Sequence, residues 1–545
     1  MAQYSKELEA MVGEAIEALP NDVRKYLKNA AIIVEDRPSR DQLEEMQDDP
    51  ENTLLGLYQG VPETEWGKGF GNVLPDKISL FQENIEQIAD TQEKIKNEIR
   101  LTVWHEIAHY FGFDDKEIED LEKKIRIVIL GGGFAGLNAV LELLRKSKNL
   151  PHFSITLVNE GDSFVFVPLL HEVATGTLSP FDVIQPIRHI LPREKIKFFE
   201  GKAIKIDFEN QTVIVRRCHE IEKGKQEITL NYDYLISALG SETNYFDIPG
   251  AKEFAQPLKT IEDAKRLRAT IIHAFEKAEF ANVAEQKKLL NFAIIGGGAT
   301  GVEVAGELVD YTSTELRQTF PRLSVKPKIT LVQAEKTLLS KEEPWFQAKA
   351  RKVLCRKGNV DVLYSQKVIE VTANGIKTQD RFIEAKTVIW TAGVKAASIM
   401  IESGASLDID EKKRIRVNEF LQLQTYPGVF IVGDQAHIAD LETQQPYPMR
   451  AQFAAREGKL AARNILSLLM GKPLRPFKWG DKGFIVSLGK GGALARILGL
   501  HFSGPLAWFI YRTAYLCNLI GLRAKLRTAV RWAINLVLPR DIAKP

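Results

Sequence analysis

Two stretches of the chain share one hydrophobic pattern: a short apolar run, a glycine-rich turn and an amphipathic segment. The first reads IRIVIL, GGGFAG and LNAVLELLRK from residue 125, and the second reads NFAII, GGGATG and VEVAGELVDY from residue 291. A continuous β-branched run is typical of a strand buried on both faces of a parallel sheet, and apolar spacing near 3.6 predicts a helix. The pattern therefore predicts two strand–turn–helix units of α/β type.

Residues 1–122 follow a different pattern and predict a small separate α+β unit. Apolar positions at helical spacing predict a first helix around residues 8–19, and residues 31–34 predict a short strand. The charged stretch at 114–124 is expected to form a helical tail or linker. A chain of 545 residues is too long for one ordinary domain.

Composition narrows the class of protein. An apolar fraction of 45% and a charged fraction of 26% are those of a folded globular protein, and a net charge of +2 gives no reason to expect a nucleic-acid partner. The three cysteines lie far apart and form no Cys-x-x-Cys pair, which fits a reducing compartment. We see no signal peptide and no apolar run of about 18 residues, so a spanning helix is not expected.

The first glycine turn satisfies the requirements of a dinucleotide site. Gly131, Gly133 and Gly136 follow a strand, open a helix and precede a second strand, FSITLVNEGD. The first glycine makes the tight turn, the second lets the backbone approach a pyrophosphate, and the third lets the helix pack on the strand. The position expected to bind the ribose hydroxyls holds Asn159, with Glu160 next to it, so either side chain could take that role.

The second turn repeats the arrangement with Gly296, Gly298 and Gly301, followed by the strand ITLVQAE. Here the ribose-reading position holds Gln333, and Glu335 lies close by. An acid would repel the 2′-phosphate of NADP, whereas a neutral glutamine does not. We therefore expect NADH or NADPH, without choosing between them.

Two dinucleotide turns in one chain predict two nucleotides, a flavin that stays bound and a nicotinamide that exchanges. A third element supports this prediction. The strand in PGVFIVGDQAH ends in Gly433 and Asp434, late in the chain, where a carboxylate could bind the ribityl hydroxyls of a flavin.

Residues 101–115, LTVWHEIAHYFGFDD, carry a zinc-binding pattern. His105 and His109 lie one helical turn apart on the same face, so both imidazoles can reach one Zn²⁺, and Glu106 is placed to activate the metal-bound water. Gly112 can turn the chain, and Asp115 falls where a third ligand is expected.

The C-terminal segment predicts a membrane-binding surface. From residue 490 onward it contains nine Lys or Arg residues and one acid. On a helical wheel an apolar face is flanked by Arg523, Arg527 and Arg531; the face comprises Leu522, Leu526, Ala529, Val530, Ala533 and Val537. A basic amphipathic helix of this kind, with Trp and Tyr nearby, should lie on an anionic lipid surface.

Residues 125–545 resemble the type II NADH:quinone oxidoreductases, also called alternative NADH dehydrogenases. The resemblance rests on motifs in the same order, namely GGGFAG, FVFVPLLHEVATG, DYLISALGSETN, GGGATGVEVAGEL, IWTAGV, VFIVGDQAH and DKGFIVSLG. It implies FAD held by the first turn and the late Gly-Asp, a nicotinamide held by the second turn, and ping-pong transfer of electrons to a membrane quinone. The resemblance also implies that Glu303 lies near the flavin and the nicotinamide. From the same resemblance we expect a peripheral protein at the cytoplasmic face of the cell membrane, and a homodimer.

The segment matching the family's quinone site departs from the pattern Ala-Gln-x-Ala-x-Gln. The sequence AQFAARE keeps Gln452, but Arg456 replaces the second glutamine, and Arg450 stands where a small hydroxyl residue is usual. Because an arginine favours a polar or anionic acceptor, a soluble protein acceptor remains an alternative.

The segment 1–122, with IIVED, LLGLYQGVP and HEIAHYFG, resembles the small bacterial zincin-like metallopeptidases. The alternative function is therefore a zinc metalloprotease whose flavoprotein part is regulatory or targets the membrane. The intact flavin and nicotinamide motifs favour the oxidoreductase.

We predict a two-domain FAD/NAD(P) flavoprotein of α/β class with a C-terminal amphipathic helical region, preceded by a small α+β zincin-like domain. The boundaries we expect are 1–122 for the zincin-like domain, 123–250 and 396–482 for the FAD domain, 251–395 for the NAD(P)H domain and 483–545 for the membrane-anchoring region.

Overall fold

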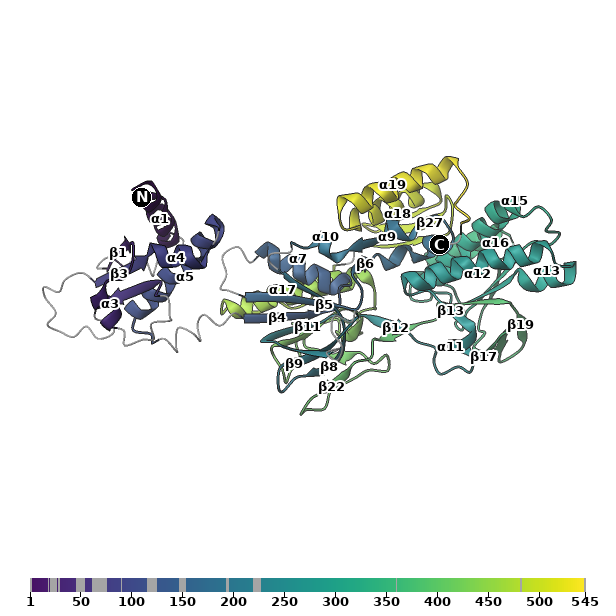
Figure 1. Cartoon of the computed structure of the whole chain (residues 1–545). Coiled ribbons are helices and arrows are strands. Elements are labelled where there is room, and N and C mark those ends of the chain that lie inside the picture. The colour runs from purple at the N-terminus through teal and green to yellow at the C-terminus, as the bar shows by residue number, and fades with distance from the viewer. Residues whose placement is uncertain are drawn as a thin grey trace. The chain divides into compact units, whose positions relative to one another are not determined.

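The computed structural model divides the chain into two compact units, Met1–Lys124 and Ile125–Pro545. It describes residues 2–17, 19, 27, 30–45, 54–60, 76–89, 91–114, 125–146, 153–192, 196–218, 227–358, 360–480 and 483–543. Figure 1 shows the helices and strands of both units.

The N-terminal unit packs helices against a three-stranded sheet of order β1-β3-β2, in which β1 runs parallel and β2 antiparallel to β3. Its elements are α1 (Ala2–Glu17), β1 (Ala30–Glu35), α3 (Arg40–Glu45), β2 (Gly56–Gln59), β3 (Asp76–Phe81), α4 (Gln82–Ile88) and α5 (Gln92–Tyr110). A core of its own, with Ile78, Leu80, Ile99 and Val103 fully or almost fully buried, joins α5 to the sheet. The first strand, predicted at 31–34, is found as β1, and the first helix, predicted around 8–19, begins earlier, at Ala2.

The larger unit begins with a sheet of order β10-β9-β8-β5-β4-β11-β24, and β22 pairs with β8. The strands at its centre are parallel: β4 (Ile125–Leu130), β5 (Phe153–Asn159), β8 (Ile196–Asp207), β11 (Tyr234–Ser237) and β24 (Val429–Ile431). The antiparallel side consists of β9 (Thr212–Arg217) and β10 (Glu227–Asn231), while β22 (Met400–Glu402) runs parallel to β8. Helices α7 (Phe134–Lys146) and α17 (Ala451–Leu469) pack against each other, since a Cβ on Gly458 would lie 2.0 Å from Ala135 O.

A second parallel sheet, of order β13-β20-β14-β15-β16, is inserted between β11 and β24. Its strands are β13 (Ala255–Pro257), β14 (Asn291–Ile295), β15 (Lys328–Val332), β16 (Val360–Leu363) and β20 (Thr387–Trp390). Its helices include α12 (Ile261–Glu279), α14 (Ala299–Asp310) and α16 (Pro344–Arg356). Beyond Asp310 the helix widens into a π-helical segment, η4 (Tyr311–Leu316). A small sheet of β17 (Val368–Thr372), β18 (Gly375–Thr378) and β19 (Phe382–Glu384) also belongs to this part of the chain.

The C-terminal part is an antiparallel sheet followed by two helices. The elements are β26 (Phe484–Ser487), β27 (Ala493–Ile497), β28 (Leu500–Ser503), α18 (Pro505–Asn518) and α19 (Leu522–Val537). None of the helices in the described part of the chain is long and apolar enough to cross a membrane.

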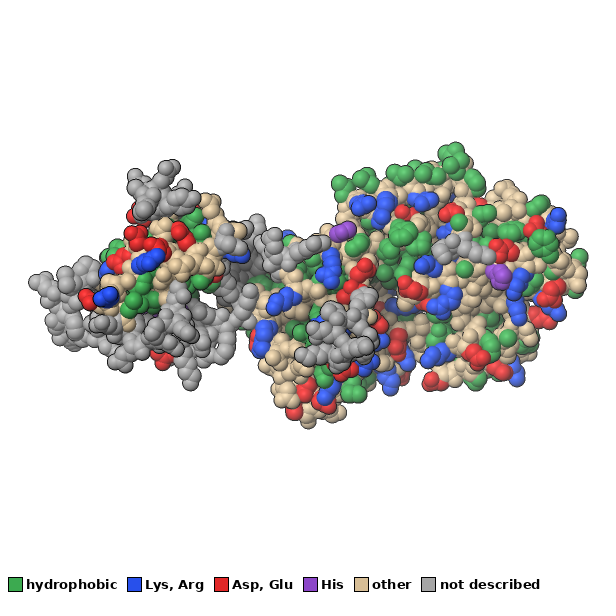
Figure 2. Space-filling view, in the orientation of Figure 1, with side chains coloured by type: hydrophobic (Ala, Val, Ile, Leu, Met, Phe, Trp, Pro, Cys, Tyr) green, Lys and Arg blue, Asp and Glu red, His purple; other side chains and the backbone are tan. Residues whose placement is uncertain are grey.

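Helix α19 exposes an apolar side, and its buried side combines Ala524 and Trp532 with Thr528 and Asn535. Leu522, Leu526, Val530 and Val537 are 57–86% exposed, whereas Thr528 is fully buried. Figure 2 shows the hydrophobic side chains gathered along the outer edge of this helix. An apolar face turned outward marks a contact surface for lipid or protein.

Candidate functional site

The first glycine turn has the shape that a dinucleotide phosphate requires. Gly131 has φ +96°, a conformation that favours glycine, and a Cβ there would lie 2.3 Å from Ala238 O. A Cβ on Gly136 would lie 1.9 Å from Gly131 O, so the helix packs too closely for any other residue. At Gly133 an added Cβ meets nothing within 4 Å. The first and third glycines are therefore required by the protein itself, while the second faces open space, as the FAD assignment needs.

The second turn repeats this geometry. Gly296 has φ +106°, and a Cβ there would lie 2.7 Å from Ala392 Cα. A Cβ on Gly301 would lie 1.8 Å from Gly296 O, whereas one on Gly298 meets nothing within 4 Å. Both turns can therefore accept a pyrophosphate at the same relative position.

A side-chain amide at the end of the following strand braces each turn. Asn159 Oδ1 accepts a hydrogen bond from Gly132 N at 2.7 Å, and Gln333 Oε1 accepts one from Gly297 N at 2.8 Å. The side chain of Glu160 is 67% exposed and lies 3.3 Å from Lys202 Nζ. The ribose-binding roles of Asn159, Glu160 and Gln333 remain predictions. The bracing role was missed, although an amide stands at the same place after both strands.

The late Gly-Asp lies against the start of the helix that follows the first turn. Gly433 has φ +70°, and a Cβ there would meet Ala135 Cβ at 3.4 Å. Its N–H donates to Glu457 Oε2 at 2.6 Å, and the Asp434 carboxylate accepts a hydrogen bond from the Ser241 hydroxyl. Burial raises the pKa of Glu457 to about 8. The chain thus brings Gly433 to the first turn, and adds a buried acid that sequence analysis did not single out.

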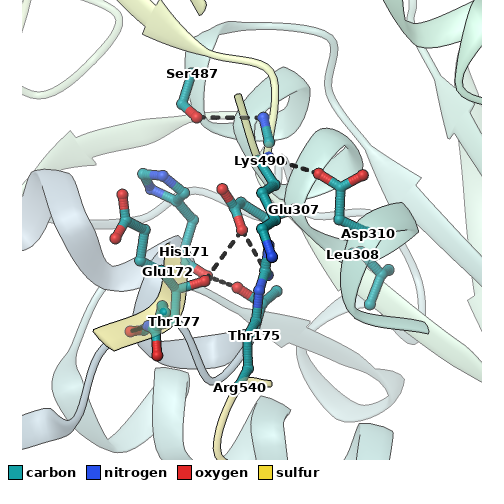
Figure 3. A network of polar contacts seen from close by, with 12 residues as sticks. His171, Glu172, Thr175, Thr177, Glu307, Leu308, Asp310, Ser487, Lys490 and Arg540 are labelled. Carbon is teal, nitrogen blue, oxygen red and sulfur yellow. Dashed lines mark hydrogen bonds and ion pairs between the residues drawn. The ribbon is translucent and has the colours of Figure 1, made fainter. Parts of the chain in front are cut away.

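Glu303 lies in a buried polar cluster. Its Oε1 accepts a hydrogen bond from Ser487 N at 3.3 Å, and its Oε2 lies 3.8 Å from His171 Nδ1. Burial, reinforced by the carboxylates of Glu172 and Glu307, raises the pKa of Glu303 to about 8. Burial lowers the pKa of His171 to about 4, so this imidazole is neutral at neutral pH. Figure 3 shows how His171, Glu172 and Glu307 converge in this cluster.

The arginines of the predicted quinone segment have partners within the protein. Arg450, at the start of α17, forms an ion pair with Glu342. Arg456 lies 4.1 Å over the ring of Trp479 and donates to a backbone carbonyl, while Gln452 is exposed in the first turn of the helix. Because the charge of Arg450 is balanced, the case for an anionic acceptor is weaker than the sequence indicated.

Helix α5 places the two histidines of the zinc pattern side by side, with their rings nearly perpendicular. His105 Nε2 lies 3.3 Å from His109 Nε2, and two ligand nitrogens on one tetrahedral Zn²⁺ lie about 3.3 Å apart. His109 Nδ1 lies 3.0 Å from Phe113 O, a contact that puts the proton on Nδ1 and the lone pair on Nε2. These imidazoles fit a zinc ion.

The other residues predicted for the zinc site are placed less completely. Glu106 is buried, and a Cβ on Gly56 of β2 would lie 2.9 Å from its Oε1. Asp115 lies outside the described residues. Within the residues that are described, no group of three His, Cys, Asp or Glu side chains could hold a metal ion. The third ligand therefore remains a prediction.

Two parallel-sheet domains with matching dinucleotide turns, one of them completed by a late Gly-Asp, define the class of two-domain FAD/NAD(P) oxidoreductases. The sequence model described as "Pyridine nucleotide-disulphide oxidoreductase" matches residues 125–458, and that described as "Zincin-like metallopeptidase" matches residues 27–125. The chain is 32% identical over 431 residues to the Type II NADH:quinone oxidoreductase Ndh of Mycobacterium tuberculosis, covering 77% of this chain and 89% of that protein. It is 31% identical over 425 residues to a probable NADH dehydrogenase of Dictyostelium discoideum, covering 77% and 91%.

Solved structures agree on the fold. NDH2 of Plasmodium falciparum in complex with NADH matches with a TM-score of 0.69 at 19% identity, over 77% of this chain and 100% of that chain. The sulfide:quinone oxidoreductase of Aquifex aeolicus matches with a TM-score of 0.58 at 18% identity, over 76% and 95%. The chain belongs to the pyridine nucleotide-disulphide oxidoreductases and, among them, to the type II NADH:quinone oxidoreductases. The predicted family, fold class and zincin-like N-terminal domain are confirmed.

Proposed function

We propose that residues 125–545 use FAD to oxidise NADH or NADPH and to reduce a membrane quinone. The observation that carries this proposal is the match to a type II NADH:quinone oxidoreductase over 89% of that protein's length. Both turns support it, since Gly133 and Gly298 leave open the two places where pyrophosphates would approach the backbone. When bound, the flavin would take hydride equivalents from the nicotinamide and pass two electrons to the acceptor.

The residues have distinct roles in this proposal. Gly131, Gly133 and Asp434 would hold FAD, and Gly296 and Gly298 would hold the nicotinamide nucleotide. Nucleotide and quinone would react in turn, by a ping-pong mechanism, because both exchange electrons with one cofactor. Glu303, with its raised pKa, would supply a proton to the acceptor.

The quinone would be reached from a lipid surface. The outward apolar face of α19 and its flanking arginines suit an anionic membrane, with the protein peripheral at the cytoplasmic face. Gln452 would lie on the acceptor side, at the start of α17. A homodimer remains an expectation from the family resemblance alone.

Stopped-flow absorbance in the flavin band tests the proposal. We expect rapid bleaching of the purified protein by NADH or NADPH without oxygen, and fast recovery on adding a soluble quinone analogue. Bleaching without recovery would point to another acceptor, such as a soluble protein. A protein that binds flavin but is never bleached would contradict the proposed function.

We propose zinc binding and peptide hydrolysis as a second activity, in the N-terminal unit. The 3.3 Å separation of His105 Nε2 and His109 Nε2 favours it, because it matches the spacing of two zinc ligands. Glu106, between them in sequence, would activate the metal-bound water.

A further inference from the structure

Two buried carboxyl groups lie one turn apart on α14. Glu303 and Glu307 occupy positions i and i+4, which share one face of a helix, and they are only 7% and 3% exposed. Two like charges this close in a buried site cannot both be stable without compensation. The neighbours of each carboxyl group therefore decide which one is ionised.

Glu307 has a buried cation as its partner. Arg540, which follows α19, donates to Glu307 Oε2 at 2.7 Å, and its Nε lies 3.2 Å from Glu315 Oε1. Thr177 Oγ1 lies 3.2 Å from the same Glu307 oxygen. Arg540 is itself only 5% exposed, so the ion pair is removed from solvent. Figure 3 shows Arg540 beside Glu307.

Helix α19, which precedes Arg540 in the chain, is fixed beside the cluster by polar groups on its buried side. Trp532 Nε1 donates to Glu172 Oε2 at 2.7 Å, and Asn535 Nδ2 donates to Thr177 O at 2.5 Å. These contacts join the C-terminal segment to α8 (Leu170–Ala174) and the turn after it. Helix α19 therefore carries both the exposed apolar face that we assign to the membrane and the contacts to the buried cluster around Glu303 and Glu307, which we call the acid cluster.

Neighbouring charges determine the protonation states of Glu303 and Glu307. Burial opposes ionisation of Glu307, but Arg540, assisted by Lys357, Arg512 and, when it is protonated, His171, lowers the pKa of this carboxyl below its usual value. Burial is the main cause that raises the pKa of Glu303. The Glu172 and Glu307 charges raise this pKa further, and the hydrogen bond from Ser487 N opposes them.

The same cluster includes other titratable groups. Burial and the Glu307 charge raise the pKa of Glu172 to about 7. Burial raises the pKa of the Tyr511 and Tyr515 phenols of α18, which also feel the charge of Glu303, and the Tyr511 hydroxyl lies 3.3 Å from His171 Nε2. Asp310 and Glu315 are further acids that act on Arg540. Among these charged groups, Arg540 is the cation that contacts the Glu307 carboxylate directly.

We propose that Arg540 is a positioning residue that holds Glu307 as a carboxylate, and that this charge adds to burial in keeping Glu303 protonated for delivery to the acceptor. The delivery step rests on the proposed function. The nicotinamide supplies two electrons and one hydrogen as hydride, whereas a quinol carries two hydrogens, so one further proton is consumed. The Glu303 O–H bond would break as a quinol O–H bond forms, and the resulting carboxylate would take its replacement proton from solvent.

Infrared titration of the full-length, flavin-loaded protein tests the control of Glu303 directly. The band of its protonated carboxyl is assigned by its loss in Glu303→Gln, and in the wild type it should titrate near pH 8. In Arg540→Gln, Glu307 should take a proton, and the midpoint of Glu303 should fall by about one pH unit. Glu307→Gln should lower it similarly, and the double variant should lower it no further than the larger single effect.

Three matched variants separate charge from packing. Arg540→Lys keeps the cation and should keep the midpoint. Glu315→Gln removes the other partner of Arg540 but leaves Glu307 paired, so the midpoint of Glu303 should again stay unchanged. Arg145→Gln removes one of two arginines beside the buried Glu142 on α7, away from this cluster, and should change nothing at Glu303.

An unchanged or raised midpoint in a folded Arg540→Gln protein would overturn the proposal. If that variant does not fold, an unchanged midpoint in Glu307→Gln overturns it equally. In turnover with NADH and a short-chain quinone, the alkaline limb of the rate should move to lower pH in step with the infrared midpoint. A wild type that reduces no quinone would reject the proposed function, while the infrared midpoints would still decide whether Arg540 governs Glu303.

Discussion

At the scale of single residues, the two glycine turns separate what the fold needs from what a ligand needs. A Cβ added at Gly133 meets nothing within 4 Å, so we expect Gly133→Val to fold and to lose FAD, because the side chain blocks the pyrophosphate. Replacing Gly136 with valine would strike Gly131 O and should impair folding itself. Flavin absorbance per mole of protein, together with a thermal melt by circular dichroism, distinguishes the two. A yellow, fully loaded Gly133→Val protein would refute the FAD assignment.

Gln333 is expected to influence the choice of nucleotide. Replacing it with glutamate keeps an acceptor for Gly297 N but adds a negative charge near the ribose, which should disfavour the 2′-phosphate of NADPH. We expect kcat/KM for NADPH to fall about tenfold relative to NADH. Glu335→Gln is the matched control and should change the ratio in the opposite direction. An unaltered ratio in both variants would show that neither side chain reads the ribose.

The glycines could be predicted from the sequence because their spacing encodes a local backbone conformation. The ion pair of Arg540 and Glu307 could not, because its residues are 233 positions apart and only the tertiary fold brings them together. The amides that brace the two turns could be predicted in part. Asn159 and Gln333 were placed correctly at the ends of their strands, but which way their side chains turn depends on the completed turn.

At the scale of elements, one side of α19 contacts the buried acid cluster, and the opposite side is apolar and exposed. Leu526 and Val530 are each 57% exposed, so their replacement by glutamate should leave the inner contacts intact and abolish binding to anionic vesicles in a sedimentation assay. Flavin content should stay unchanged. Leu441→Glu, at an exposed residue outside α19, should still sediment. Vesicle binding that survives both α19 substitutions would assign the anchor to another surface.

Truncation of the same region should have a different effect. Deleting residues 523–545 removes Arg540 and Trp532, leaving Glu307 and Glu172 without these buried partners. Loss of one member of a buried ion pair costs about 3–5 kcal/mol, so we expect a lower midpoint of thermal unfolding as well as release from membranes. A truncated protein as stable as the full chain, measured by calorimetry, would show that the cluster tolerates its unpaired acids.

The pattern of elements was largely accessible from sequence because hydrophobic periodicity is a local property. The strand at residue 125 and the helix after the first turn coincide with β4 and α7. The first helix was expected around 8–19 and is found as α1, Ala2–Glu17, since the apolar pattern marks its buried face rather than its start. Most of the tail expected at 114–124 lies outside the described residues. The π-helical segment η4 had no visible signal, because the same residues would also suit an ordinary α-helix.

At the scale of the whole molecule, the two compact units have separate hydrophobic cores. Among the described residues, the buried core of the N-terminal unit comes from α1, β3, α4 and α5, with side chains of β1 and β2 packed against it. The large core of the second unit begins at Ile127. Each unit is therefore expected to fold on its own core. Expressed alone, residues 125–545 should retain FAD and quinone reductase activity. A fragment that loses its flavin would instead make the N-terminal unit part of the flavoprotein's stability.

The zinc assignment allows the two proposed activities to be separated within the intact protein. His105→Ala and His109→Ala should each abolish stoichiometric zinc, measured by atomic absorption after dialysis, because each removes a ligand nitrogen. Glu106→Gln should keep the metal and lose peptide hydrolysis, because only the water-activating carboxylate is changed. In all three variants, the rate of NADH oxidation by quinone should equal that of the wild type, since the units have separate cores. A quinone reductase rate that falls when zinc is lost would show that the N-terminal unit controls the flavoprotein, and would favour a regulatory zinc site over an independent peptidase.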